Sequence, residues 1–293
     1  MHVEALKTYI SDRWPEAYRR LRRLRWSPHR FWTQTLESNY WLYERLSWLT
    51  GYERERKQTV EILGYEPDLQ NPRTLNEKII WKKLHVRDAL LTKTTDKLQV
   101  RDYVRDKLGR PAENLLIPVL HVTDDLQDLR LDAFTPPFVL KANHGSGFNL
   151  FVRDRPSENR FRVSEERRPT QLWTTEDIVD QCQEWLDTPY GFYKHEWAYQ
   201  NIPRKIFIEP FLKDEFGTQL TDVKIDCFHG QPSVHLVKVY QEEQPALSIL
   251  DEEGNRMDVG YENHDAVPEA VLHHLRPYLP SLRRCATQLA ADF

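Results

Sequence analysis

The spacing of hydrophobic residues predicts mainly helices in the first 110 residues. Apolar positions recur at helical spacing in segments 12–26, 33–49 and 95–108. A further helix is predicted to end near Gly64, and both Gly51 and Gly64 are typical of helix C-caps. The N-terminal third of the chain is therefore expected to be helical.

A break in the helical pattern precedes one more predicted helix. Asn71-Pro72-Arg73 interrupts the pattern, and Thr74 with Glu77 forms the spacing of a capping box. Apolar residues at 79, 80 and 84 follow. We expect a helix that begins directly after Thr74.

Short apolar runs bounded by turn residues predict strands after residue 115. Residues 138–140 and 150–152 are two such runs, close enough to pair across a turn. The other predicted elements are a strand at 115–122, a polar loop at 153–170, a helix at 173–187, a strand beginning at 205–208, a hairpin of 223–227 with 234–239, and a helix at 267–290.

The turn at Asn143-His144-Gly145-Ser146-Gly147 is the first candidate for chemistry. Glycines permit backbone angles that direct successive N–H groups at one point, as in loops that bind phosphate. Lys141 ends the preceding apolar run and adds a positive charge at the mouth of the turn. From this stretch alone, a phosphate site and an ordinary hairpin both stay open.

Composition places the chain among globular proteins with a large core. Its 293 residues, 40% hydrophobic, suggest two lobes or one large domain with an extension. No apolar run is long enough to cross a membrane, and the N-terminus lacks the apolar core of a signal peptide. Three widely spaced cysteines predict neither a disulfide framework nor a zinc site. We expect a cytoplasmic protein without a nucleic-acid partner.

Positive charge is concentrated at the N-terminus. Residues 1–30 carry eight Lys/Arg and three Asp/Glu, although the whole chain has a net charge of −4. Segment 12–26 combines an apolar stripe with six arginines, five of them between positions 19 and 25. A solvated basic helix packed on the body is the favoured interpretation; a helix on the inner membrane surface and a clamp for an acidic polymer are the alternatives.

Three common classes of nucleotide-binding or catalytic protein lack their motifs here. The sequence has no G-x-x-x-x-G-K-[ST] phosphate loop, and His195-Glu196 has no second histidine at the spacing of a zinc protease. No G-x-S-x-G is present to supply a serine nucleophile. We do not expect a hydrolase.

Six motifs, in order from about residue 60 onward, resemble those of the teichuronopeptide-biosynthesis (TupA)-like ATP-grasp family. They are Pro72-Arg73-Thr74-Leu75-Asn76-Glu77-Lys78-Ile79; Thr95-Asp96-Lys97 with Val100-Arg101; Phe138-Val139-Leu140-Lys141 with 143–147; Ile202-Pro203-Arg204-Lys205; Ile208-Glu209-Pro210-Phe211-Leu212; and Asp222-Val223-Lys224 with Phe228-His229-Gly230. Their order makes the resemblance more specific than any single motif.

The resemblance implies an α+β ATP-grasp fold, in which two antiparallel-sheet lobes with helices enclose ATP. The implied ranges are a basic helical extension at 1–70, N-terminal ATP-grasp helices at 71–114, a lid lobe at 115–205 and a C-terminal lobe at 206–293. The implied reaction joins an amino acid to a sugar or uronic acid of a surface polysaccharide by an amide bond, through an acyl phosphate. An ATP-grasp kinase or glycan transferase, and a weakly catalytic nucleotide- or glycan-binding protein, are the alternatives.

The resemblance also implies roles for individual residues. Lys97 and Lys141 would bind the phosphates of ATP with the turn at 143–147, and the backbone of Glu209-Pro210-Phe211-Leu212 would contact adenine. Asp222 and Lys224 share one strand face and would bind ribose, or metal and phosphate; Asp222 is the expected Mg²⁺ ligand. Arg73, Lys78, Arg101 and Arg204 are candidates for an anionic substrate. Family members carry further Mg²⁺ ligands beyond the position of Phe293, so we expect the chain as given to be a poor catalyst.

Overall fold

The computed structural model describes residues 40–165, 169–212, 221–240, 245–259 and 264–293. The chain forms two compact units, Met1–Asp88 with Thr188–Asn201, and Ala89–Asp187 with Ile202–Phe293. The basic segment 12–26 and the first part of the helix expected at 33–49 lie outside the described residues. Among the described helices, none is long and apolar enough to cross a bilayer.

The first unit contains helices α4 (Tyr40–Leu49), α5 (Glu53–Leu63) and α6 (Leu75–His85), with the short 3₁₀ turns η3 (Phe192–Lys194) and η4 (Trp197–Asn201). Helix α5 ends at Gly64 in the left-handed conformation, as predicted. The capping box is also confirmed, because Thr74 and Glu77 exchange hydrogen bonds at the start of α6.

The second unit begins with α7 (Ala89–Thr95), α8 (Gln99–Leu108) and α9 (Pro111–Leu115). The single helix expected at 95–108 is thus interrupted at Asp96–Leu98. The Asp96 carboxylate accepts hydrogen bonds from the Leu98 backbone and the Gln99 side chain, so it competes locally with a continuous helix.

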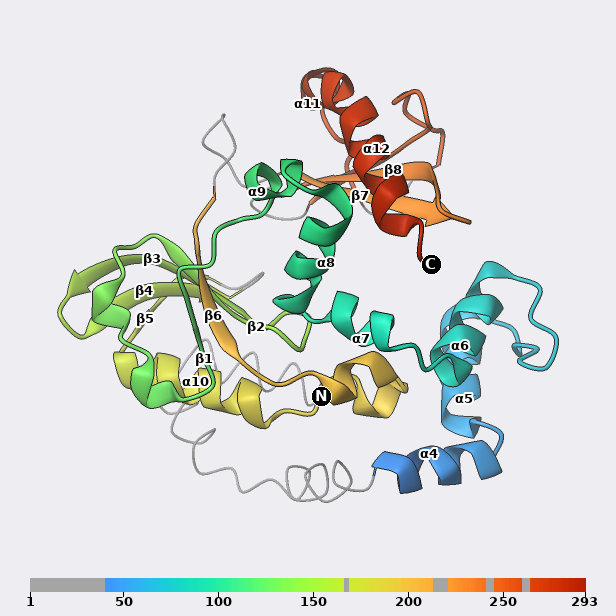
Figure 1. Cartoon of the computed structure of the whole chain (residues 1–293), viewed down its shortest axis with the longest axis horizontal. Coiled ribbons are helices and arrows are strands. Elements are labelled where there is room, and N and C mark those ends of the chain that lie inside the picture. The colour runs from blue at the N-terminus through green and yellow to red at the C-terminus, as the bar shows by residue number, and fades with distance from the viewer. Residues whose placement is uncertain (1–39, 166–168, 213–220, 241–244, 260–263) are drawn as a thin grey trace. The chain divides into compact units, whose positions relative to one another are not determined.

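A six-stranded antiparallel sheet is the main layer of the second unit, in the order β1-β6-β2-β3-β4-β5 (Figure 1). Its strands are β1 (His121–Thr123), β2 (Phe138–Ala142), β3 (Asn149–Ser157), β4 (Arg160–Glu165), β5 (Gln171–Trp173) and β6 (Ile206–Pro210). Strand β6, expected to open the C-terminal lobe, is hydrogen-bonded between β1 and β2. The short turns η1 (Leu126–Asp128) and η2 (Leu131–Ala133) lie between β1 and β2 in sequence.

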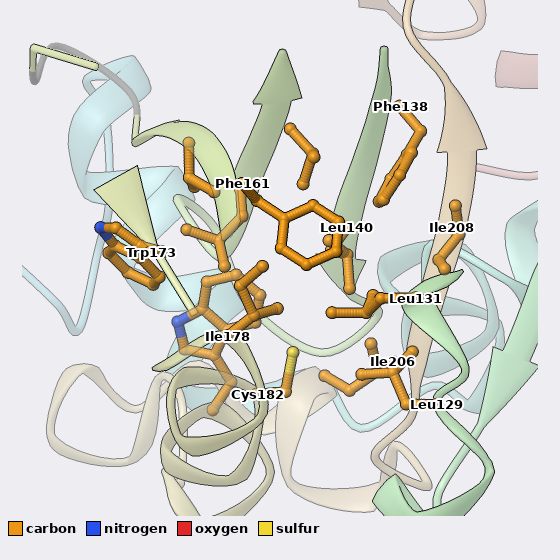
Figure 2. Close-up of a cluster of buried hydrophobic side chains, with 14 of the residues drawn as sticks. Leu129, Leu131, Phe138, Leu140, Phe161, Trp173, Ile178, Cys182, Ile206 and Ile208 are labelled. Carbon is orange, nitrogen blue, oxygen red and sulfur yellow. The ribbon is translucent and has the colours of Figure 1, made fainter. Parts of the chain in front are cut away.

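One face of this sheet is covered by the main hydrophobic core. Helix α10 (Thr175–Asp187) contributes Ile178, Cys182 and Trp185 to this core. Ile178 and Cys182 pack on the side of the sheet from which alternate strand residues such as Leu140 and Ile208 project (Figure 2). These side chains are almost completely buried. Because neighbouring residues of a strand point to opposite faces, the residues between them lie on the other side of the sheet.

A second, three-stranded antiparallel sheet has the order β7-β8-β9. Strands β7 (Thr221–Phe228) and β8 (Gln231–Val239) form the predicted hairpin, and β9 (Ala246–Leu250) pairs with β8. Helices α11 (Glu269–Leu275) and α12 (Leu279–Ala290) pack a smaller core against it. The expected helix at 267–290 is divided by the 3₁₀ turn η5 (Arg276–Tyr278), which contains Pro277.

Two sequence predictions in this unit were wrong. The strand expected at 115–122 is reduced to β1, because Pro111–Leu115 is helical and only His121–Thr123 pair with β6. The expected loop at 153–170 contains the end of β3 and all of β4. Buried Phe161 and Val163 alternate with arginines in β4, so the strand period was present but the charges obscured it.

Candidate functional site

Charged side chains lie on the face of the six-stranded sheet opposite the main core. In β2, Leu140 points into the core, so Lys141 points away from it; in β6, Ile208 and Glu209 are related in the same way. Lys141 is paired with Phe207 and Glu209 with Val139, which makes Lys141 and Glu209 diagonal neighbours on one face. The strand register therefore brings these two charges together.

Glu209 connects two cations. Its carboxylate lies 2.5 Å from Lys141 Nζ and 3.5 Å from a terminal nitrogen of Arg101, which comes from α8. The side chain of Glu209 is 7% exposed, whereas that of Lys141 is 26% exposed. Arg101 also donates to the Ile117 carbonyl and is 11% exposed. Its described contacts are thus internal, and a contact with an anionic substrate stays a prediction.

Lys97 lies beside the turn after β2, between helices α7 and α8 rather than within the expected helix. Its ammonium donates to the Ala142 carbonyl at 3.1 Å and to the Gly145 carbonyl. Burial and, to a lesser extent, the neighbouring positive charge of Lys141 lower the pKa of Lys97 from 10.5 to about 8, against the opposing effects of Asp96 and Glu209. A pKa of about 8 leaves Lys97 mostly protonated at neutral pH.

Asn143 fixes the start of the turn through hydrogen bonds to two distant segments. Its side-chain nitrogen donates to the Asp96 carboxylate and the Pro203 carbonyl, both at 2.9 Å, and its side-chain oxygen accepts from the Lys205 backbone at 2.8 Å. The residue is 1% exposed. The predicted role in ATP binding is untested, but the side chain has the contacts of an anchor for the turn.

The remaining turn residues differ in where they point. His144 is buried, with its Nε2 3.0 Å from the Trp185 carbonyl and its ring against Phe148. Gly145 is buried, whereas Ser146 and Gly147 are exposed. Gly147 has a φ of +76°, which an L-residue rarely adopts, so glycine is favoured there. The exposed tip of the turn is the part available to a ligand.

These groups give a locally positive site. Lys97, Lys141 and Arg101 supply three positive charges, and Glu209 with Asp96 supplies two negative charges. All five are at least partly removed from water, where charges interact more strongly than they do in bulk solvent. The arrangement can attract an anion beside a glycine turn, as phosphate recognition requires.

An aromatic and guanidinium group next to the site was not recognised in the sequence. Phe151 from β3 lies edge to face with Phe211 at 6.2 Å between ring centroids. The Arg153 guanidinium lies 4.6 Å from the Phe211 ring centroid and 5.5 Å from that of Phe151. Arg153 directly follows an apolar run, as Lys141 does, so the pattern that identified Lys141 as a candidate could also have identified Arg153.

The predicted adenine segment begins on this face. Glu209 and Pro210 end strand β6, and Phe211 packs against Phe151 and Arg153. Leu212 is 37% exposed. Residues 213–220 lie outside the described part of the chain. The edge-to-face pair of Phe151 and Phe211 beside Pro210 provides apolar contacts of the type that a nucleobase uses.

Asp222 and Lys224 lie on the separate three-stranded sheet. They share one face of β7, as predicted, because Val223 between them packs into the smaller core. Across the hairpin, Asp222 is paired with Lys238 and Lys224 with Leu236. Within the described ranges, no group of three His, Cys, Asp or Glu residues is arranged to hold a metal ion.

The other candidate substrate residues are not gathered into this cluster by any described contact. Arg204 is partly buried and donates to the Leu186 carbonyl at 2.8 Å, and burial lowers the pKa of its guanidinium. Arg73 and Lys78 belong to the first unit, at the start of α6, and both are exposed. Their role stays a prediction.

Comparison with protein families matches residues 77–275 to TupA-like ATPgrasp, which is more than half of the chain. No curated protein and no solved structure matches the chain significantly. The antiparallel sheets with flanking helices agree with the α+β architecture expected of this fold. Membership indicates an ATP-dependent enzyme of the ligase type. The chain belongs to the TupA-like ATP-grasp family.

Proposed function

We propose that the protein is an ATP-dependent carboxylate–amine ligase that joins an amino acid to a sugar or uronic acid of a surface polysaccharide. A carboxylate would accept the terminal phosphoryl group of ATP to give an acyl phosphate and ADP. The amine of the second substrate would then displace phosphate and form the amide. The observation that carries this proposal is the cation cluster beside a glycine turn, in a chain of ATP-grasp type.

The phosphates of ATP are proposed to contact Lys141, Lys97 and the exposed tip of the turn at Ser146 and Gly147. Lys141 projects from the sheet, and Lys97 donates hydrogen bonds to the Ala142 and Gly145 carbonyl groups at the turn. Both ammonium groups would stabilise negative charge on the phosphoryl group during transfer. The Glu209 carboxylate restrains Lys141, so the cation is already oriented before ATP arrives.

Adenine is proposed to lie along residues 209–212, beside the aromatic group of Phe151 and Phe211. Pro210 restricts the backbone and donates no hydrogen bond, so the neighbouring residues would supply the donors and acceptors for the base. Lys224 and Asp222 of β7 would contact the nucleotide from the second sheet. Phe211 and Arg153 would limit the thickness of the adenine pocket.

Magnesium fits this site only with ligands supplied by the nucleotide. Asp222 is one half-buried carboxylate, and Mg²⁺ usually takes one or two protein carboxylates together with phosphate oxygens and waters. We propose Asp222 as its protein ligand. When bound, Mg²⁺ would neutralise charge on the phosphates.

Binding of the anionic sugar is assigned to Arg73 and Lys78, whose side chains are exposed. Arg204 and Arg101 have internal contacts, so their proposed contribution is to position neighbouring segments. The suggested contact of residues 12–26 with a membrane surface or an acidic glycan concerns residues outside the described structure and stays a prediction.

The test is product analysis with panels of amino acids and uronic acids in the presence of ATP and Mg²⁺. A ligase yields ADP, phosphate and a new amide, which mass spectrometry identifies; a kinase leaves phosphate on the acceptor. Lys141→Met should abolish product, whereas Lys57→Met, which removes an exposed lysine in α5, should not. Amide formation that survives Lys141→Met would refute the assigned site, and phosphorylated acceptor would refute the ligase.

A further inference from the structure

Arg153 is placed by an irregularity of the six-stranded sheet. At this residue the pairing of β3 with β4 shifts by one position, which leaves Arg153 as an extra residue without a partner in β4. Such a β-bulge redirects a side chain, and bulges are common beside functional sites. The Arg153 guanidinium contacts the rings of Phe151 and Phe211. Phe151 shares a face of the sheet with Glu209, because both are paired with Val139. Arg153 is therefore directed onto the charged face of the sheet.

Three contacts hold the guanidinium of Arg153 in place. It lies 4.6 Å from the ring centroid of Phe211 and 5.5 Å from that of Phe151. Its Nε donates a hydrogen bond to the hydroxyl of Ser164 at 3.2 Å, and Ser164 is 7% exposed. Arg153 itself is only half-buried, so a ligand can reach it. The contacts fix the planar group before a ligand binds, which reduces the entropy that binding costs.

In the part of the chain that the structure describes, no carboxylate forms an ion pair with Arg153. Its neighbour Asp154 pairs with Arg162 at 2.9 Å, and Glu209 pairs with two other cations. Burial also lowers the pKa of the Arg153 guanidinium, because removal from water disfavours the charged form. A partly desolvated guanidinium without a carboxylate interacts favourably with the π face of an aromatic ring. Arg153 thus has the properties of a ligand-binding cation.

The position of Arg153 along β3 separates it from the cations assigned to phosphate. Lys141 is paired with Asn149, the first residue of β3. Arg153 lies four residues further along the strand, which corresponds to about 13 Å at about 3.3 Å per residue. An extended nucleotide covers a similar distance between its terminal phosphate and its base. With the phosphates at Lys141 and the glycine turn, the base is the part of the nucleotide nearest to Arg153.

We propose that Arg153 recognises the base of the nucleotide through its face, with the guanidinium plane stacked on the purine ring. Nucleobases stack on guanidinium planes as they do on aromatic side chains, and the positive charge adds a cation–π attraction. Arg153 thereby does more than limit the thickness of the pocket. The inference rests on the proposed function, since it takes the nucleotide to lie on this face of the sheet.

This mode of binding predicts which nucleotides the site accepts. A purine overlaps more of the guanidinium than a pyrimidine does, so loss of Arg153 should weaken ATP more than CTP. A cation stacked on the ring does not contact the hydrogen-bonding edge of the base. Selection between adenine and guanine is therefore left to the backbone of residues 209–212.

The experiment is calorimetric titration of the full chain with ATP, CTP and inorganic tripolyphosphate, which has the phosphates but no base. We expect Arg153→Met to weaken ATP binding about tenfold and tripolyphosphate binding by less than about twofold. The matched control, Arg160→Met, removes an exposed arginine at the start of β4 and should change neither affinity. Arg153→Lys keeps the charge but not the plane, so it should recover only part of the lost ATP affinity.

The outcomes separate this inference from the proposed ligase. Urea unfolding establishes that each variant is folded; if Arg153→Met is not, the ratio of ATP to tripolyphosphate affinity in Arg153→Lys decides in its place. An unchanged ATP affinity in the variant, or an equal loss for tripolyphosphate, would overturn the role of Arg153 and leave the ligase intact. Wild-type protein that does not bind ATP would overturn both. A phosphorylated acceptor, together with ATP binding that depends on Arg153, would refute the ligase and support this inference.

Discussion

Changing Asn143 to Asp tests whether this residue anchors the turn. The substitution preserves the size of the side chain and the oxygen that accepts from the Lys205 backbone. It replaces two N–H donors by an acceptor that faces the Asp96 carboxylate and the Pro203 carbonyl. At neutral pH, the folded protein would then hold two neighbouring carboxylates in a buried position.

The expected loss can be worked from the hydrogen bonds. In Asn143→Ala, two bonds to neutral groups at about 1 kcal/mol each and one to a carboxylate at about 2 kcal/mol give a loss of about 4 kcal/mol in the free energy of unfolding. Asn143→Asp should lose at least as much near pH 7, because it adds charge repulsion without creating a cavity.

The pH dependence separates the two variants. Burial beside Asp96 raises the pKa of the introduced carboxyl in the folded state. The loss in the free energy of unfolding that its charge causes is therefore present at neutral pH and decreases as the pH is lowered. A protonated carboxyl can also donate to Asp96. We therefore expect Asn143→Asp to recover stability relative to Asn143→Ala between about pH 7 and pH 4.5.

Urea unfolding followed by circular dichroism across this pH range measures the effect. Asn201→Asp, at an exposed position, is the control for a general effect of one added charge. If Asn143→Asp is as stable as the wild type but loses ATP affinity, Asn143 is a ligand for ATP and not an anchor. A loss of stability that does not depend on pH would contradict the proposed contact with Asp96.

Three further predictions concern individual charges. Backbone hydrogen bonds from Thr74, Arg73 and Asp68 lower the pKa of Glu77 from 4.5 to about 2, so the stability advantage of the wild type over Glu77→Gln should be complete above pH 4.5 and disappear in urea unfolding as the pH falls toward 2. Lys97 has a pKa of about 8 and loses its charge as the pH rises above that value, so the ATP affinity measured by calorimetry should fall about tenfold between pH 7 and 9.5. Lys97→Arg, which stays charged, should remove most of this fall. An unchanged wild-type affinity at pH 9.5 would exclude a contact between Lys97 and phosphate. Glu209→Gln should reduce the free energy of unfolding by about 2 kcal/mol. This is less than the roughly 3–5 kcal/mol typical of breaking a fully buried ion pair, because the Lys141 side chain is 26% exposed. An unchanged free energy of unfolding in urea would show that the ion pair does not stabilise the protein.

The sequence was most informative where the structural role of a residue depends on its neighbours in the sequence. The Thr74 capping box and the glycine that ends α5 depend on neighbouring residues only, and both were predicted correctly. The position of Lys141 could also be predicted, since a charge that ends a buried strand must emerge at its edge or face. Local patterns were sufficient for the capping box and the helix end because the partners there lie within four residues.

Other features depend on partners far apart in the chain. The ion pair of Lys141 with Glu209 spans 68 residues, and the contact of Arg101 with Glu209 spans 108. Spacing gave no indication that Glu209 would bind cations through its side chain. Asn143 could be recognised as part of a turn, but its anchoring bonds require the register of β2 with β6. The β4 strand was missed because arginines dilute its apolar alternation.

The hydrogen bonds of Asn143 also have a consequence for the order of folding. The turn after β2 is held by residues 47 positions before it and about 60 positions after it. Closing such long loops is slow in comparison with forming a hairpin. The β2–β3 hairpin can therefore form early, whereas the turn acquires its final shape only when residues 203–205 reach the sheet. On the ribosome, the proposed ability of the turn to bind phosphate would therefore arise late, after β6 has been synthesised.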